Sequence, residues 1–289
     1  MIDQDDGGPP YDGASPGGLL LAAGIFSVVS LLPPGAFLSW GWRVPFLLSA
    51  LLLLLGLFIR LGISETPEFN ATKREDASEV PGLELLRAHR WSGVLAIGAR
   101  LVETVSGNMV KSFGLTYVTL QLGLPKQTAL TALTATSIVG LLVTPLYGAL
   151  GDRFGQRPLY MIGCGFVAVL AFPFFWLLEG RSAVTIWIAF VTAYNLGPTL
   201  LLSVQPSLFS KMFRARVRYT GLSVAYQVSS IVGGFTPLIA LWLLRISGGS
   251  PRLVASFPIL AAAISFAAVA ALGLAQVREQ RSCREANTA

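Results

Sequence analysis

The residues of this sequence that could do chemistry are a few polar side chains inside long apolar stretches. Arg100 and Glu103 are three positions apart in the stretch 91–118, and a helix brings such positions to one face, where the two side chains can pair. Asn195 and Gln227 stand in two other apolar stretches. Carboxylate, guanidinium and amide groups can bind a small polar solute, and a carboxylate can also carry a proton. We therefore predict that Arg100, Glu103, Asn195 and Gln227 belong to a substrate or proton pathway.

The elements that must position these residues are eight apolar stretches, each long enough to cross a bilayer as a helix. A transmembrane helix needs about 20 residues to span about 30 Å of hydrocarbon. The sequence therefore predicts an all-α fold, a polytopic membrane helix bundle with eight transmembrane helices. The stretches are 17–33, 44–61, 91–118, 128–150, 158–178, 183–205, 218–244 and 253–275.

Three of the polar residues are expected at similar depths in the membrane. At 1.5 Å per residue, Glu103 lies about 18 Å along its helix, Asn195 about 20 Å and Gln227 about 15 Å. Substrate sites of secondary transporters lie near the bilayer midplane. Two alternatives remain open: Asn195 and Gln227 can be interhelical hydrogen-bonding residues, and Arg100 with Glu103 can be a pair that only neutralises itself.

Composition excludes several classes of function. Hydrophobic residues make up 53% of the chain and charged residues 12%, about half the charged share of a soluble domain. The net charge of +6 comes mainly from short loops, where Lys and Arg set topology, so we expect no nucleic-acid partner. Cys164, Cys283 and the single His89 match no metal-site spacing. The sequence has no phosphate-binding loop and no arrangement of catalytic groups, so we expect no cofactor, no metal and no enzyme activity.

The distribution of positive charge predicts the orientation. If the loop 62–90 is cytoplasmic and the spans alternate, fourteen Lys and Arg face the cytoplasm and five face outside, as the positive-inside rule requires. The segments 1–16 and 277–289 are then cytoplasmic tails. We expect a multi-pass protein of the inner membrane.

Three stretches of sequence resemble the major facilitator superfamily, in particular its metabolite:proton symporter branch. They are Trp40–Phe46 with Glu65–Phe69, then Gly148–Pro158, and finally Arg216–Gly221 with Tyr226 and Gln227. The resemblance covers about residues 17–276 and implies proton-coupled transport of a small carboxylate or zwitterion by alternating access. It aligns this chain with helices five to twelve of the family fold and leaves the first four without a counterpart. Residues 17–61 are then a two-helix remnant of the N-terminal half, and 91–276 a six-helix C-terminal bundle.

The second stretch matches the family's loop motif G-x-x-x-D-R-x-G-x-R, with Gly148, Asp152, Arg153, Gly155 and Arg157. The resemblance implies a gating role, in which the Asp152 carboxylate binds the start of the helix near Val217 in one conformation. The alternative is an ordinary polar turn whose arginines follow the positive-inside rule.

Other polar or flexible positions leave two interpretations each. Lys111 either extends to the interface or attracts anions into a cavity. The breaks at Gly197-Pro198 and Gly233-Gly234 are either flexible points or sites of close packing.

A second hypothesis for the whole chain is a truncated membrane protein that does not transport, or a subunit whose partner supplies the missing helices. Because the N-terminal half lacks most of its packing partners, we expect the helices 17–33 and 44–61 to dock loosely or to pair with each other beside the six-helix bundle. The isolated chain is then expected to be poorly active, a homodimer or bound to a partner chain. The partners expected under both hypotheses include the lipid bilayer; small metabolites and protons are partners only of a transporter.

Overall fold

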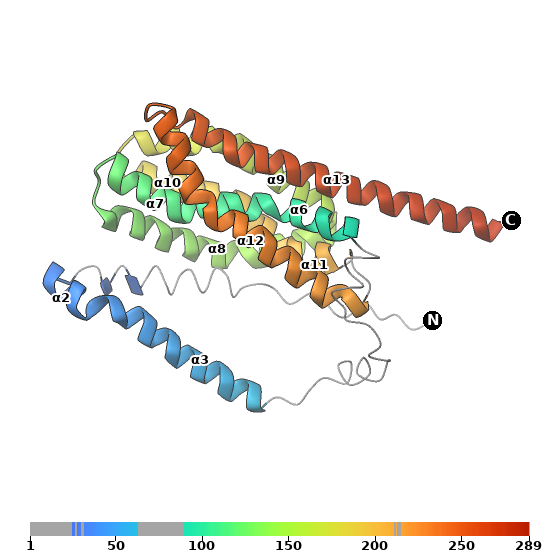
Figure 1. Ribbon diagram of the computed structural model, residues 1–289, viewed down its shortest axis with the longest axis horizontal. Helices are drawn as coiled ribbons and strands as arrows, with labels where there is room; N and C mark the ends of the chain where they lie inside the picture. Colours follow the sequence, from blue (N-terminus) through green and yellow to red (C-terminus); the bar gives the residue numbers. More distant parts are fainter. Residues whose placement is uncertain are drawn as a thin grey trace.

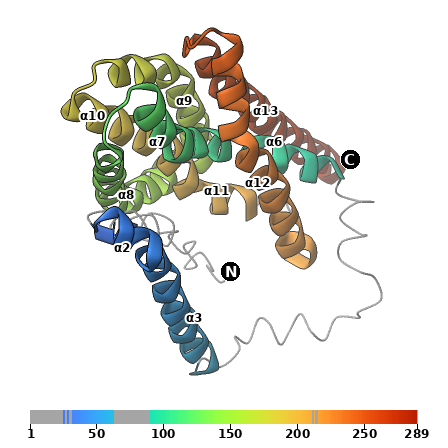
Figure 2. The same cartoon turned by 60° about the vertical axis from the view of Figure 1, so that its left-hand side comes forward.

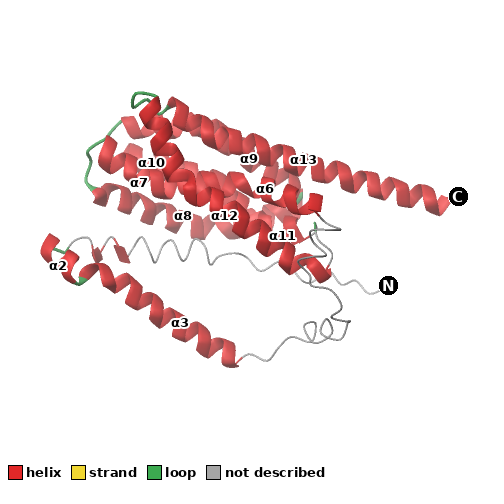
Figure 3. Cartoon of the chain, viewed as in Figure 1, coloured by secondary structure: helices red, strands yellow, loops and turns green. Residues whose placement is uncertain are grey.

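The computed structural model describes residues 25–26, 28–29, 32–62, 90–210, 212 and 215–288. This part of the chain consists of helices joined by short turns and loops, without a strand (Figure 3). Before the long loop come the short helices α2 (Pro34–Ser39) and η1 (Gly41–Arg43), and then α3 (Val44–Gly62). The loop predicted at 62–90 lies almost wholly outside the described residues.

Residues 90–210 and 215–288 form six helical rods that pack side by side in a bundle (Figures 1 and 2). The first rod is α6 (Arg90–Asn108) continued by the π-helix η2 (Met109–Phe113), the short α7 (Gly114–Thr116) and the π-helix η3 (Tyr117–Gln121). The others are α8 (Lys126–Phe154), α9 (Gln156–Glu179), α10 (Ala183–Tyr194) continued by the π-helix η4 (Asn195–Thr199) and α11 (Leu200–Ser210), α12 (Ala215–Ile246) and α13 (Arg252–Thr288).

Glycine and proline separate the rods. Gly155 has φ of 91°, a conformation that side chains with a β-carbon rarely adopt, and it ends α8 and precedes the first residue of α9. Pro158 lies in the first turn of α9, where its missing N–H leaves no helical hydrogen bond unmade. The helix α13 extends to Thr288, so the segment predicted as a C-terminal tail continues the last rod.

The outer surface of the bundle is apolar, with exposed Leu142, Trp176 and Phe235. Large exposed hydrophobic side chains are expected where helices face lipid. The interior contains a cluster around Phe113, Phe174 and Phe190 and a second one around Tyr160 and Leu201.

Six stretches of the described chain are long and apolar enough to span a membrane: Gly41–Phe58, Lys126–Phe154, Gln156–Glu179, Ala183–Ser210, Thr220–Ile246 and Arg252–Gly273. The predicted count of eight is therefore not confirmed. The stretch 17–33 lies mostly outside the described residues. The rod from Arg90 is long enough but carries Arg100, Glu103 and Lys111, which lower its hydropathy.

The helix α3 extends away from the bundle in both views (Figures 1 and 2). Its side chains are mostly exposed, including Leu53 and Phe58. The earlier expectation of loose docking by helix 44–61 agrees with this arrangement but stays a prediction.

Candidate functional site

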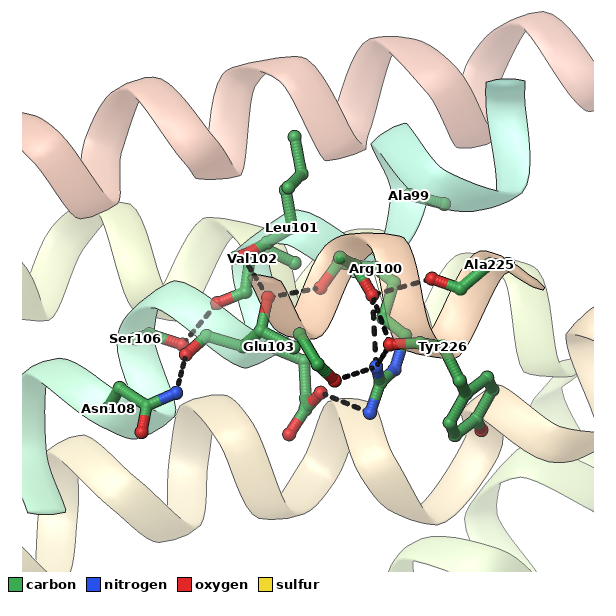
Figure 4. Close-up of polar contacts among 12 residues, drawn as sticks. Ala99, Arg100, Leu101, Val102, Glu103, Ser106, Asn108, Ala225 and Tyr226 are labelled. Carbon is green, nitrogen blue, oxygen red and sulfur yellow. Dashed lines mark hydrogen bonds and ion pairs between the residues drawn. The ribbon is translucent and has the colours of Figure 1, made fainter. Parts of the chain in front are cut away.

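The centre of the candidate site is the ion pair between Arg100 and Glu103 on α6 (Figure 4). Arg100 Nη2 lies 3.5 Å from Glu103 Oε2, and the side chains are only 10% and 13% exposed. Since charges inside a membrane protein are costly, two such groups one turn apart require mutual neutralisation and further polar partners.

Most of the further partners of Arg100 lie on α12. Arg100 Nη1 donates to the carbonyl oxygen of Tyr226 at 2.7 Å, to Ser229 Oγ at 2.9 Å and to Ser230 Oγ at 3.1 Å. The guanidinium carbon also lies 3.8 Å from the centre of the Tyr226 ring, within the range of a cation–π interaction. Arg100 thus fastens α6 to α12 at the level of Tyr226.

The backbone of α6 beside Arg100 is bound by two neighbouring helices. Ser265 of α13 accepts a hydrogen bond from the Val102 N–H at 3.0 Å and donates to the Gly98 carbonyl at 2.8 Å. Tyr160 of α9 donates its hydroxyl proton to the Ala99 carbonyl at 2.8 Å. Because Ser265 and Tyr160 are fully buried, these contacts fix the position of the helix segment that carries the ion pair.

Lys111 lies in η2, and its Nζ stands 5.5 Å from the centre of the Tyr194 ring on α10. Tyr194 is buried and Lys111 is half-buried. The ammonium is therefore directed toward the neighbouring helix α10, and both interpretations of Lys111 stay predictions.

Asn195 and Gln227 do not join the ion pair in a single cluster. Asn195 is buried and donates from Nδ2 to the Thr136 carbonyl of α8 at 3.2 Å and to the Val191 carbonyl at 3.0 Å, while it accepts from Thr199. These contacts support the interpretation as an interhelical hydrogen-bonding residue. Gln227 is exposed on α12, next in sequence to Tyr226.

The two predicted breaks differ in the structure. Gly197-Pro198 lies in the π-helix η4, where a β-carbon on Gly197 would stand 2.8 Å from a Val167 methyl group of α9, so this break is a site of close packing within an irregular turn. Gly233-Gly234 lies inside the continuous helix α12. A β-carbon on Gly233 would stand 2.8 Å from Thr104 Cβ of α6, so this glycine is a site of close packing.

The loop motif lies at the α8–α9 turn. Asp152 and Arg153 are exposed and Gly148 is half-buried. The close approach of helices in this region occurs at Gly151, where a β-carbon would stand 2.9 Å from a Val204 methyl group. The side chains of residues 215–219 lie outside the described part of the chain, so the contact of Asp152 with the start of α12 stays a prediction.

Arg157, the last arginine of the motif, connects α9 to α13. It donates to the Ala270 carbonyl at 2.9 Å, and its guanidinium occupies the space where a side chain at Gly273 would begin. This motif arginine therefore helps to hold the last helix of the bundle.

Sequence reasoning missed Gln205, which is fully buried on α11. Neither atom of its amide has a hydrogen-bond partner among the described residues. Its position before Pro206 in an apolar stretch is the signal that could have identified it. Within the described ranges, no three His, Cys, Asp or Glu side chains are grouped as metal ligands.

Comparison with known proteins gives one consistent result. The family model described as Major Facilitator Superfamily matches residues 13–237 and 102–285. The chain is 37% identical over 247 residues to the shikimate transporter of Escherichia coli K12, and this alignment covers 83% of this chain and 56% of the relative. It is 31% identical over 250 residues to the glycine betaine/proline/ectoine/pipecolic acid transporter OusA of Dickeya dadantii, covering 82% and 49%.

A structural neighbour supports the same fold. The crystal structure of a D-xylose–proton symporter superimposes with a TM-score of 0.61 at 20% identity, covering 88% of this chain and 61% of the neighbour. The chain spans about half the length of the curated relatives it matches. The two relatives are named as transporters and not as enzymes, which agrees with the expectation drawn from the sequence.

Proposed function

Because the chain belongs to the Major Facilitator Superfamily, as its sequence motifs predicted, we propose that it takes part in proton-coupled symport of a small carboxylate or zwitterionic metabolite. The transport cycle is alternating access, in which one helix bundle moves against another around a central site. The observation that carries this proposal is the buried Arg100–Glu103 pair. An intramembrane carboxylate beside a cation is a group that can gain and lose a proton as its surroundings change.

The substrate class is supported by the relatives. The substrates in their names, shikimate in one case and glycine betaine or proline in the other, all carry a carboxylate group. Glu103 is our candidate for the proton-binding group, and Arg100 is its partner. Gln227 stays a predicted pathway residue apart from the ion pair, and Asn195 contributes only by positioning α10 and η4.

Uptake into proteoliposomes tests the proposal. Purified protein is reconstituted and given labelled shikimate, glycine betaine and proline, with and without an inward proton gradient. We expect uptake of at least one probe, stimulated by the gradient, and loss of this stimulation in Glu103→Gln. The matched control is Glu179→Gln at the far end of α9. If no probe is taken up, or if Glu103→Gln keeps the stimulation, the proposal is wrong.

We propose a location in the inner membrane with the loop 62–90 and both tails in the cytoplasm. The charge distribution supports this orientation. Single cysteines at Ser78 and Ser247, in a chain whose own Cys164 and Cys283 are replaced, test it by labelling of intact cells. Ser247 should react from outside and Ser78 should not; labelling of Ser78 from outside overturns the orientation.

We also propose that α12 is covered by a second copy or by a partner chain. Ser223, Gln227 and Ser230 are exposed along it, and polar side chains are unfavourable against lipid. Cross-linking of a cysteine at Ser223 in native membranes tests this contact. A cysteine at Leu142, on the apolar surface of α8, is the control; equal cross-linking from both positions would contradict a specific contact.

A further inference from the structure

Phe209, near the end of α11, packs against two tyrosines that bind α6 beside the ion pair of the candidate site. Its side chain is fully buried. The centres of the Phe209 and Tyr226 rings are 6.4 Å apart, and the ring planes are nearly perpendicular, at 86°. The centres of the Phe209 and Tyr160 rings are 6.3 Å apart, with the planes at 43°. Both distances lie within the range in which aromatic rings attract each other.

Each tyrosine connects Phe209 to a different part of α6. Tyr226 of α12 places the centre of its ring 3.8 Å from the guanidinium carbon of Arg100, and its carbonyl accepts a hydrogen bond from Arg100 Nη1 at 2.7 Å (Figure 4). Tyr160 of α9 donates its hydroxyl proton to the Ala99 carbonyl at 2.8 Å. Phe209 is therefore one contact away from both the side chain and the backbone that set the position of the guanidinium.

A smaller side chain at position 209 would remove the aromatic support of the Tyr226 ring. Arg100 is buried and its guanidinium lies over that ring, so a ring that has lost its neighbour can turn and no longer holds the cation in one place. Because Arg100 Nη2 is 3.5 Å from Glu103 Oε2, any displacement of the guanidinium changes the electrostatic energy of the ion pair. Position 209 therefore acts on the pair without contributing a charge.

Glu103 also has titratable and charged neighbours on other helices. Electrostatic interaction with Glu103 extends to one residue of its own rod and to two neighbouring helices, and the ring over Arg100 comes from a third helix. A change at position 209 reaches Glu103 through the two tyrosines that Phe209 contacts. The whole set is Lys111 on the same rod, Tyr160 on α9, Tyr194 on α10 and, beside Arg100, Tyr226 on α12.

We propose that Phe209 is a positioning residue of the transport site, which holds the Tyr226 ring against Arg100 and so keeps the guanidinium beside Glu103 while this carboxyl group gains and loses its proton. A neutral carboxyl group attracts the guanidinium less than a carboxylate does, so in that state the contacts with α12 must hold it. This inference rests on the proposed function, because it concerns the proton-binding group named there.

A double-mutant cycle tests the positioning of Arg100 independently of transport. The free energy of unfolding in mixed detergent is measured for Phe209→Leu, for Arg100→Met and for the two changes together. If Phe209 positions Arg100, the double variant loses less stability than the sum of the two single losses. The matched control is Phe190→Leu, since Phe190 is equally buried on the same rod but packs on Phe174 in the other core cluster. Its loss should add to that of Arg100→Met.

The pH profile of uptake tests the part of Phe209 in proton coupling. Uptake of labelled shikimate, glycine betaine and proline into proteoliposomes is measured over a series of pH values. We expect Phe209→Leu to shift the pH of half-maximal uptake by about half to one pH unit, which corresponds to the energy of one aromatic pair, and Phe190→Leu to leave it unchanged. Loss of folded protein alone lowers the amount of uptake but does not move this pH.

A second variant removes the ring that Phe209 supports. Tyr226→Leu should shift the pH of half-maximal uptake in the same direction as Phe209→Leu, because both changes release the guanidinium from the same contact. If Phe209→Leu does not fold, Tyr226→Leu takes its place in the cycle and in the uptake assay. Shifts of opposite sign in the two variants would overturn the inference.

The outcomes separate this inference from the proposed function. If the wild type shows proton-stimulated uptake but Phe209→Leu keeps its pH profile, Phe209 is not a positioning residue and the transport proposal stands. The same conclusion follows if the losses of Phe209→Leu and Arg100→Met are simply additive. If the wild type takes up none of the three probes, both proposals are wrong.

Discussion

Removal of Arg100 should destabilise the bundle mainly through the charge that it leaves behind on Glu103. In Arg100→Met the Ser229 hydroxyl keeps its bonds to the Ala225 carbonyl at 2.7 Å and the Tyr226 carbonyl at 3.2 Å. Glu103, however, loses the guanidinium that faces it at 3.5 Å. Removal of one partner from a buried ion pair costs about 3–5 kcal/mol, so we expect the free energy of unfolding to fall by that amount.

The double variant Arg100→Met with Glu103→Gln separates the two contributions. It removes the charge on residue 103, so that only the hydrogen bonds of Arg100 to α12 are lost. Hydrogen bonds between transmembrane helices average about 0.6 kcal/mol each, and the bonds to Tyr226, Ser229 and Ser230 therefore sum to roughly 2 kcal/mol.

Reversible unfolding in mixed detergent, followed by circular dichroism, gives both free energies. The double variant should be more stable than the single variant Arg100→Met. If the double variant is as unstable as Arg100→Met or less stable, Glu103 is not the origin of the cost and the reasoning is refuted.

The same unfolding assay checks three further predictions. Gly163→Ala should lower the free energy of unfolding by about 1–3 kcal/mol through overpacking, since its β-carbon would stand 2.8 Å from a Leu200 methyl group. The control Gly165→Ala, with nothing within 4 Å of the added β-carbon, should be neutral. Equal losses in both variants would contradict the packing argument. Ser265→Ala should cost about 1 kcal/mol because the Gly98 carbonyl loses its donor; no change would mean that this bond contributes nothing. Gln205→Leu should stabilise the chain by about 1–2 kcal/mol, since it removes a buried amide without a described partner; destabilisation would show that Gln205 has a partner.

The sequence predicted the fold well where hydropathy alone decides the structure. The stretches 128–150 and 158–178 correspond to α8 and α9 within a few residues, because long apolar segments in a bilayer must be helical. The exact ends were less predictable. The polar residues after Gly273 continue the helix α13, since helix propensity and not hydropathy determines where a helix outside the membrane ends.

The candidate site was predictable only in part. The spacing of Arg100 and Glu103 indicated a pair on one helix face, and the structure has that pair. Spacing along one helix does not reveal which neighbouring helix a side chain faces. The attachment of Arg100 to Tyr226, the bonds of Asn195 to α8 and the burial of Gln205 therefore became visible only in the packed bundle.

The hydrogen bonds that Ser265 and Tyr160 make with α6 have a consequence for the movements that this rod can make. Ser265 and Tyr160 bind the backbone of α6 at Gly98, Ala99 and Val102. Arg100 binds the same helix to α12. A twist or slide of α6 would break all these bonds together, so it has to travel with α9, α12 and α13 as one body. Beyond Asn108 the rod changes to the wider turns of η2 and η3, whose looser hydrogen bonding permits bending. We therefore expect the segment Arg90–Asn108 to keep its position in the bundle and the segment Met109–Gln121 to bend. Lys111 lies near the start of this second segment.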